Sequence, residues 1–148
     1  MNRWMRNAMA GLLILLPAAT SLAADIAVHR DPGCGCCEKW AALLRENFHR
    51  PVVMIDEKKR VAFRNAHGVP AALGSCHTAL IDGMVFEGHV PIADIKRVLA
   101  ERPKGLVGLA VKGMPMGSAG MEVPGGMSQA YDVMTFGPAG QRVYAHHG

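Results

Sequence analysis

The chain has 148 residues, half of them hydrophobic, with 16 basic residues, 12 acidic residues and few aromatic ones. Two of the basic residues, Arg3 and Arg6, lie in an amino-terminal segment, so the charge of the remainder is nearly balanced and forms no basic stripe. This composition gives no support to nucleic-acid binding, and we exclude that class. The length suits one domain with its own core.

Residues 1–23 have the pattern of a secretory signal peptide. A positively charged start is followed by an apolar run over residues 8–16, and Ser21 and Ala23 suit cleavage after Ala23. The apolar run is short for a membrane span, although an uncleaved anchor is the alternative. We therefore predict an exported protein whose mature part, residues 24–148, forms one domain that is not bound to a membrane after cleavage.

The mature chain then alternates runs typical of strands and helices. The predicted elements are a strand over 26–29, a helix over 38–48, a strand over 52–55, a helix over 57–67, strands over 76–81 and 84–87, and a helix over 91–101. Asp82-Gly83 is a strong signal for a two-residue hairpin turn. The basic run Lys58-Lys59-Arg60 is expected to be a solvated helix start.

The last part of the chain differs in composition. Residues 105–126 are rich in Gly, Pro and Met and predict a loop, and residues 131–136 and 142–144 predict a small hairpin. The element order indicates an α/β fold. With a cysteine motif at the start of the first helix, it is the order of a thioredoxin-like fold with a Met/Gly-rich C-terminal extension. Periodicity alone does not separate this fold from other small α/β layouts.

Three of the four cysteines stand within four residues, in the CxCC motif Cys34-Gly35-Cys36-Cys37. A disulfide between the neighbours Cys36 and Cys37 would be strained. Cys34 and Cys37 have the CxxC spacing, and the amino terminus of a helix favours thiolates because its unpaired N–H groups stabilise anions. The cluster therefore predicts chemistry on sulfur, either metal binding or redox exchange.

The fourth cysteine, Cys76, begins a predicted strand. In a thioredoxin-like layout this position faces the start of the cysteine-bearing helix, so four sulfurs are expected to converge. His77 is a candidate metal ligand, although alternation along a strand would point it away from Cys76, and a packed or exposed histidine is the alternative. A position near the site is one interpretation of His29 and His89, but each is more simply explained as a histidine of the surface or core. The pair at 146–147 is expected to lie in a frayed tail.

Methionines are concentrated in the predicted loop, among glycines and prolines. They are Met114, Met116, Met121 and Met127. Thiolates together with thioethers are ligands suited to Cu(I), whereas Zn²⁺ rarely uses Met. The alternative is that these side chains fill gaps in a hydrophobic core.

Three interpretations of the cysteines follow: metal binding, thiol–disulfide exchange and purely structural disulfides. In an exported protein, four cysteines can form two disulfides in three connectivities. The adjacency of Cys36 and Cys37 and the methionine-rich loop favour a metal. Cys36 lies inside the CxxC pair, where it could trap mixed disulfides in an oxidoreductase.

Several motifs in combination carry a family resemblance. They are residues 31–40, 68–70, 75–79, 87–91, 108–111, 113–115, 117–118 and 120–122. Together they resemble the exported CxCC metal-binding family once catalogued only as a domain of unknown function. Its better-known members are the CopG-type periplasmic copper resistance proteins.

The resemblance implies a thioredoxin-like periplasmic protein that binds copper through clustered cysteines, in the setting of bacterial copper or silver tolerance. It also implies several copper ions that share bridging thiolates, and a shuttle between Cu(I) and Cu(II). Activity as a copper oxidoreductase is left open beside plain metal binding. The expected partners are copper ions and other periplasmic copper-handling proteins. The predicted metal ligands are Cys34, Cys36, Cys37, Cys76, His77, Met114, Met116 and Met121.

Overall fold

The computed structural model describes residues 25–148, so the predicted signal peptide lies outside the described residues. The strands are β1 Ile26–Arg30, β2 Val52–Asp56, β3 His77–Ile81, β4 Met84–Glu87, β5 Gly108–Ala110, β6 Tyr131–Phe136 and β7 Val143–His147. The helices are α1 Gly35–Phe48, α2 Arg60–Ala66 and α3 Ile92–Glu101, with a short 3-10 turn, η1, at Ala71–Leu73.

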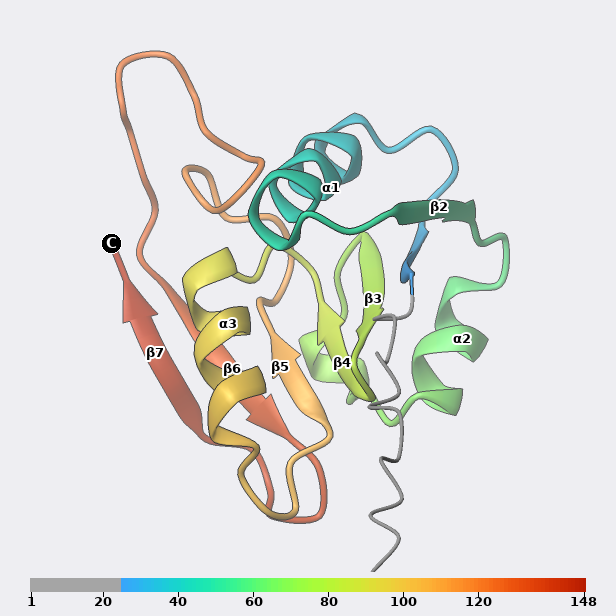
Figure 1. Ribbon diagram of the computed structural model, residues 1–148. Coiled ribbons are helices and arrows are strands. Elements are labelled where there is room, and N and C mark those ends of the chain that lie inside the picture. Colours follow the sequence, from blue (N-terminus) through green and yellow to red (C-terminus); the bar gives the residue numbers. More distant parts are fainter. Residues whose placement is uncertain (1–24) are drawn as a thin grey trace, which may run out of the picture.

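All seven strands join one sheet in the order β2-β1-β3-β4-β5-β6-β7 (Figure 1). β1 and β2 are parallel and are connected by α1, while β3 is antiparallel to both β1 and β4. β4 and β5 are again parallel and are connected by α3. β6 and β7 extend the sheet as antiparallel strands. The prediction of an α/β class is confirmed.

Two hydrophobic clusters pack on the sheet. The larger one joins α1 and α3 to the strands, and its fully buried members include Ile26, Val28, Trp40, Leu44, Ile81, Phe86, Ile95, Val98, Leu109 and Val133. The smaller one contains Val69, Leu73, Val85, Ala110 and Phe136. Successive strand residues such as Val85 and Phe86 belong to different clusters because side chains alternate between the two faces of a sheet. The core therefore has two layers, one on each face.

The predicted hairpin at Asp82-Gly83 is confirmed. Both residues have positive φ, 49° and 79°, as a type I′ turn requires, and Ile81 pairs with Met84. The turn length fixes the register of β3 and β4, and this register positions the site residues that adjoin the far ends of the two strands.

Other predicted elements differ from the structure at their ends. α1 begins at Gly35 rather than 38, because Cys34 is its N-cap and accepts from the backbone N–H of Cys37 at 3.3 Å. α2 begins only at Arg60, since the Glu57 carboxylate accepts from the backbone N–H of Lys59 and holds the preceding residues in a turn. The predicted loop over 105–126 contains the short strand β5.

The expectation of a frayed carboxyl terminus is wrong. His146 and His147 belong to β7, which pairs with β6. Their imidazoles lie 2.7 Å from carboxylate oxygens of Asp132 and Asp94, respectively. These contacts hold the last strand on the sheet and against α3.

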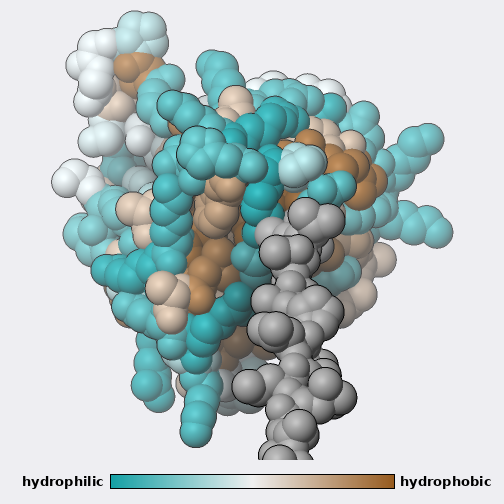
Figure 2. Space-filling view, in the orientation of Figure 1, coloured by the Kyte–Doolittle hydropathy of each residue, from teal (hydrophilic) through white to brown (hydrophobic). Residues whose placement is uncertain are grey.

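Hydrophilic residues cover most of the face seen in Figure 2, and the hydrophobic surface on it includes a central band, a patch at the upper right and a smaller spot on the projecting loop at the upper left. Across residues 25–148, none of the helices has the length and apolar character needed to cross a membrane.

Candidate metal centre

The CxCC motif lies where β1 passes into α1. Cys34 caps the helix, and Cys36 and Cys37 occupy its first turn. Cys34 and Cys37 form a disulfide, whereas Cys36 is free. The helix amino terminus therefore presents a disulfide-bonded pair with a third sulfur between its members in the sequence.

Cys76 reaches this loop because β3 lies next to β1 in the sheet. The backbone N–H of Asp31 donates to the carbonyl of Cys76 at 2.9 Å, which fixes the two segments together. The Sγ atom of Cys76 lies 3.5 Å from that of Cys37, and Cys36 lies 3.3 Å from Cys34. All four sulfurs lie within 4.8 Å of one another. The prediction that the four cysteine sulfurs converge is confirmed.

The four sulfurs differ in exposure. Cys34 and Cys36 are half-buried, while Cys37 is fully buried and Cys76 is only 6% exposed. Burial, together with the negative charge of a neighbouring Cys36 thiolate, raises the pKa of Cys76 to about 12. In the absence of a metal, Cys76 is therefore a protonated thiol at neutral pH.

His77 does not point away from Cys76, contrary to the alternation argument. Cys76 stands just before β3, where alternation is not yet established, and the Nδ1 atom of His77 lies 3.4 Å from Cys76 Sγ. The imidazole is fully buried against the Trp40 ring at 4.4 Å between centroids, and its Nε2 atom has no partner within residues 25–148. Burial is the main reason that its pKa falls well below 6.5, so the ring is neutral.

His89 is a member of the site that the sequence analysis did not select. It is fully buried, and its Nε2 atom lies 3.2 Å from Cys76 Sγ. Its Nδ1 atom lies 2.8 Å from the carbonyl oxygen of Ala119, which can only accept, so Nδ1 carries the proton and Nε2 presents a lone pair to the sulfur. Burial lowers the pKa of His89 as well. A backbone bond that orients the second ring nitrogen is common in metal-binding histidines.

The hairpin turn contained a signal for His89. Thr78 pairs with Glu87 across β3 and β4. Continuing this pairing two residues further places His89 opposite Cys76. The predicted Asp82-Gly83 turn thus already implied that these two side chains are neighbours.

The methionine-rich loop covers the exposed side of the cluster only in part. The sulfur of Met114 lies 3.9 Å from Cys36 Sγ, and Met114 is 53% exposed. Within residues 25–148 no such contact joins a cysteine to Met116 or Met121, both of which are half-buried. The loop is nevertheless anchored to α1, because a Cβ atom at Gly120 would lie 2.8 Å from the backbone nitrogen of Trp40.

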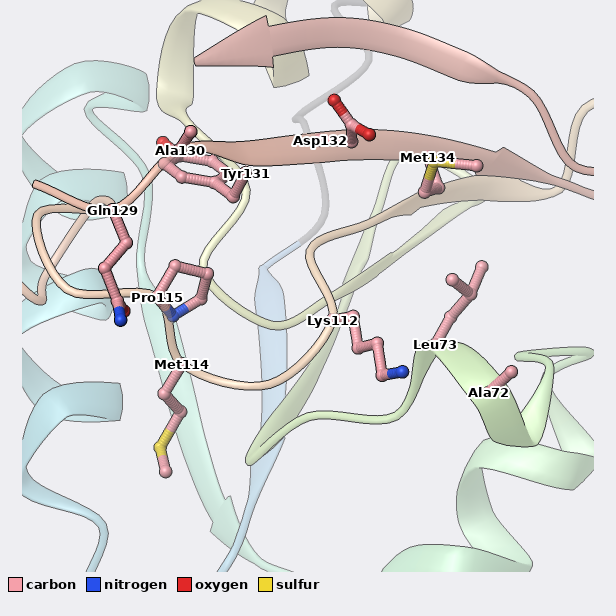
Figure 3. A pocket seen from close by; sticks show the side chains of 10 residues that line it. All are labelled: Ala72, Leu73, Lys112, Met114, Pro115, Gln129, Ala130, Tyr131, Asp132 and Met134. Carbon is pink, nitrogen blue, oxygen red and sulfur yellow. The ribbon is translucent and has the colours of Figure 1, made fainter. Parts of the chain in front are cut away.

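A groove of about 700 Å³ begins beside Met114 and continues along the loop (Figure 3). Its lining residues are Ala72, Leu73, Lys112, Met114, Pro115, Gln129, Ala130, Tyr131, Asp132 and Met134. The thioether of Met114 therefore stands between the cysteine cluster and an open groove.

The donor atoms of the site are sulfur and imidazole nitrogen. Thiolates and thioethers select soft cations such as Cu(I), and imidazole also suits copper and zinc, whereas Mg²⁺ and Ca²⁺ prefer oxygen. Four thiolates require reduction of the Cys34–Cys37 disulfide by two electrons. The fold and the site define a small mixed α/β protein whose cysteine cluster can hold a soft metal.

Comparisons with known proteins agree with this chemistry. A family described as "Protein of unknown function, DUF411" matches residues 73–121. A solved structure described as "Copper resistance protein copG", form 1, has 42% sequence identity and a TM-score of 0.77, covering 85% of this chain and 98% of that chain. Form 2 has 43% identity and a TM-score of 0.76, covering 84% and 98%. A search of curated proteins found no match.

The chain therefore belongs to the CopG-type copper resistance family, and the resemblance inferred from its motifs is confirmed. Membership in this family and the cysteine cluster together support a copper-binding role.

Proposed function

We propose that this protein binds copper as Cu(I) through Cys34, Cys36, Cys37 and Cys76 and serves copper tolerance in the bacterial periplasm. The observation that carries the proposal is the convergence of four cysteine sulfurs within 4.8 Å. Thiolate sulfur is the ligand that Cu(I) prefers, and four sulfurs at this spacing suit thiolates shared by more than one ion. Ag⁺, which has the same softness, is expected to bind at the same place.

Binding through all four thiolates requires the reduced pair. An external dithiol supplies the two electrons and two protons that convert the Cys34–Cys37 disulfide into two thiols and is itself oxidised to a disulfide; each cysteine thiol then loses its proton as it binds the metal. For Cys76, the metal has to displace a proton held with a pKa of about 12. His89 Nε2 and Met114 Sδ are placed to complete the shell on opposite sides of the cluster.

We assign the first four strands and their helices to a thioredoxin-like arrangement. The support is the parallel β1–α1–β2 unit, the antiparallel β3–β4 hairpin, the α3 helix that follows it, and a CxxC pair at the start of α1. β5, β6 and β7 are then an extension added to one edge of that arrangement.

The periplasmic location rests on the predicted signal peptide and on the family. Cell fractionation and amino-terminal sequencing test it, because a mature chain recovered by osmotic shock is expected to begin at Ala24. Recovery of the uncleaved chain in the membrane fraction would contradict this location.

The copper proposal is tested by loading the reduced mature protein with Cu(I) under anaerobic conditions, removing free metal and counting bound copper by elemental analysis. The wild type is expected to retain copper, and the double variant Cys34→Ser/Cys37→Ser is expected to retain much less. The matched control is the unreduced wild type, whose Cys34–Cys37 disulfide is intact and which should also retain less copper. Equal copper in all three samples would sink the proposal.

A second function is favoured by the disulfide itself. In the reduced protein, the Cys34 thiolate would attack a substrate disulfide and release one substrate thiolate; Cys37 would then attack Cys34, release the second substrate thiolate and restore the Cys34–Cys37 disulfide, which an external dithiol reduces again. Cys36 stands 3.3 Å from Cys34 and competes with Cys37 for that attack. Metal-free turnover in an insulin reduction assay would favour this oxidoreductase over copper binding.

A further inference from the structure

A network of buried charges lies behind the cysteine cluster. The Glu87 carboxylate at the end of β4 is fully buried and accepts from the backbone N–H of Ser75 at 2.7 Å and from the Thr78 hydroxyl. Guanidinium nitrogens of Arg60 and Arg64 lie 3.4 and 3.6 Å away. Arg60 is itself buried, so the expectation that the 58–60 run is solvated is wrong for this residue.

The Ser75 end of this network connects two sulfur-bearing segments. Ser75 precedes Cys76, and its hydroxyl donates to the carbonyl of Gly113, which precedes Met114. The fit is close, since a Cβ atom at Gly88 would lie 2.6 Å from the Ser75 hydroxyl oxygen. The position of Ser75, which Glu87 holds through its N–H, therefore determines where both segments lie.

The Arg60 end connects the third segment. Arg60 Nε lies 3.4 Å from the Asp31 carboxylate, in the loop before the CxCC motif. The Asp31 carbonyl accepts from the backbone N–H of Cys34 at 3.1 Å. The backbone N–H of Asp31 donates to Cys76. Hydrogen bonds and ion pairs thus connect all three sulfur-bearing segments to one carboxylate.

Stability alone does not explain this network. Removing two charges from water costs several kcal/mol for each ion, and well-packed apolar residues in place of a buried pair are often neutral or stabilising. A buried pair does, however, restrict the arrangements that the chain around it can take. What the network supplies here is a fixed relation among three loops.

Resting on the proposed metal binding, we infer that Glu87, together with Arg60, is a positioning residue of the copper site. It touches no metal ligand side chain. It holds the CxCC loop, Cys76 and Met114 in the one arrangement in which their sulfurs share a metal.

Two variants test this inference. Glu87→Gln removes one charge and leaves the exposed Asp31 carboxylate as the partner of Arg60, whereas Arg60→Met/Glu87→Met removes the buried pair and keeps an apolar core. Cu(I) affinity is measured by competition with a chromogenic Cu(I) chelator on the reduced mature protein. Changes around metal ligands commonly weaken binding about 10- to 100-fold, and we expect a loss of that size in both variants.

The matched control is Asp94→Asn, which removes another buried carboxylate, paired with Arg97 and His147 and bonded to none of the sulfur-bearing segments. It should destabilise the protein but leave Cu(I) affinity within about threefold of wild type, a change of under 1 kcal/mol. A folded Arg60→Met/Glu87→Met variant with wild-type affinity would overturn the inference.

A second measurement needs no metal. The sulfurs of Cys37 and Cys76 lie 3.5 Å apart in the disulfide-bonded structure. After reduction, a short thiol-to-thiol cross-linker of the bimane type, given a long incubation because both thiols are buried, should join them, and peptide mapping detects the product. We expect the yield to fall severalfold in Arg60→Met/Glu87→Met and to stay at the wild-type level in Asp94→Asn. A wild type that binds no copper would refute the proposed function, while this cross-link would still decide whether Glu87 positions the cysteines.

Discussion

The two sides of the cysteine cluster are held in different ways. On the loop side, Cys34 and Cys36 are half-buried, and Met114 beside them is 53% exposed. On the strand side, Cys76 is 6% exposed, and both His77 and His89 are fully buried. The loop side is therefore accessible to solvent, whereas the strand side is enclosed by the core.

This difference assigns separate tasks to the two sides. On the loop side, Cys34 is joined to Cys37 in a disulfide while Cys36 is free. The strand side provides a thiol that burial keeps protonated and two neutral imidazoles. A soft metal that arrives from solvent would meet Cys36 and Met114 first and the buried donors last.

Trp40→Ala should have the largest effect, because it disrupts the packing that holds the strand side in place. Trp40 is fully buried, packs on His77 and donates to the carbonyl of Val90 at 2.9 Å. Loss of a buried tryptophan typically costs about 3–5 kcal/mol in the free energy of unfolding. Urea unfolding measures this loss. Trp40→Phe, which keeps an aromatic ring, should lose clearly less, and equal losses would show that the ring does not hold the strand side in place.

Alkylation of the unreduced protein measures the difference in reactivity between the two sides. The thiolate is the reacting form, so a pKa of about 12 should make Cys76 react at least about 100-fold more slowly with iodoacetamide than the half-buried Cys36 near pH 8. Peptide mapping at successive times measures both rates. Denaturant provides the control, since unfolding should bring the two rates together. Similar rates in the native protein would contradict a buried, protonated Cys76.

Acid should weaken the strand side through His77. Its folded-state pKa lies well below the ordinary value of 6.5, so between these two values the unfolded chain takes up a proton that the native chain refuses. The free energy of unfolding should therefore fall as pH falls below about 6.5, by about 1.4 kcal/mol for each unit of separation.

The variant His77→Phe isolates this effect. It keeps an aromatic ring beside Trp40 but removes the proton site, so urea unfolding from about pH 7 to about pH 5 should show a smaller loss than in wild type. The lowered pKa of His89 also makes the protein less stable as pH falls, and the raised pKa of Glu87 has the opposite effect. Both residues are present in the wild type and in the variant, so they do not account for a difference between the two. Identical pH profiles would count against a neutral, buried His77.

The smallest effect is expected on the exposed side. Met114→Leu should lower Cu(I) affinity by about tenfold or less, because it removes one weak thioether ligand and leaves the thiolates in place. Its control is Met127→Leu, which changes a methionine of the same loop that is 64% exposed and lies in no contact with a cysteine. A larger loss of Cu(I) affinity in Met127→Leu than in Met114→Leu would contradict the proposal that Met114 is the methionine ligand.

The parts of the fold that depend on local sequence could be predicted. Asp82-Gly83 defines a hairpin because few residues other than glycine, asparagine and aspartate adopt positive φ easily. The convergence of Cys34 and Cys76 was expected from the thioredoxin-like element order, because the antiparallel strand β3 begins beside the loop that follows β1. Short β5 was missed because its three residues are selected by pairing with β4 and not by local propensity.

The rest of the site depends on contacts between distant segments. Nothing in the run 58–60 distinguishes buried Arg60 from its exposed neighbours, because its carboxylate partner is 27 residues away. The CxCC spacing likewise allowed a metal site or a disulfide, because sulfur atoms in either state satisfy it. Sequence reasoning thus located the sulfurs but not the groups that hold them.

The two-residue turn between β3 and β4 also determines which side chains meet at the metal centre. Because Ile81 pairs with Met84, continuing the same register along both strands places His89 opposite Cys76. One residue inserted at the turn would move every β4 side chain to the other face of the sheet if β3 kept its place. The histidine would then leave the cysteine, although every ligand would still be present in the sequence. In this small protein, loop length is as much a part of the coordination chemistry as the identity of the ligands.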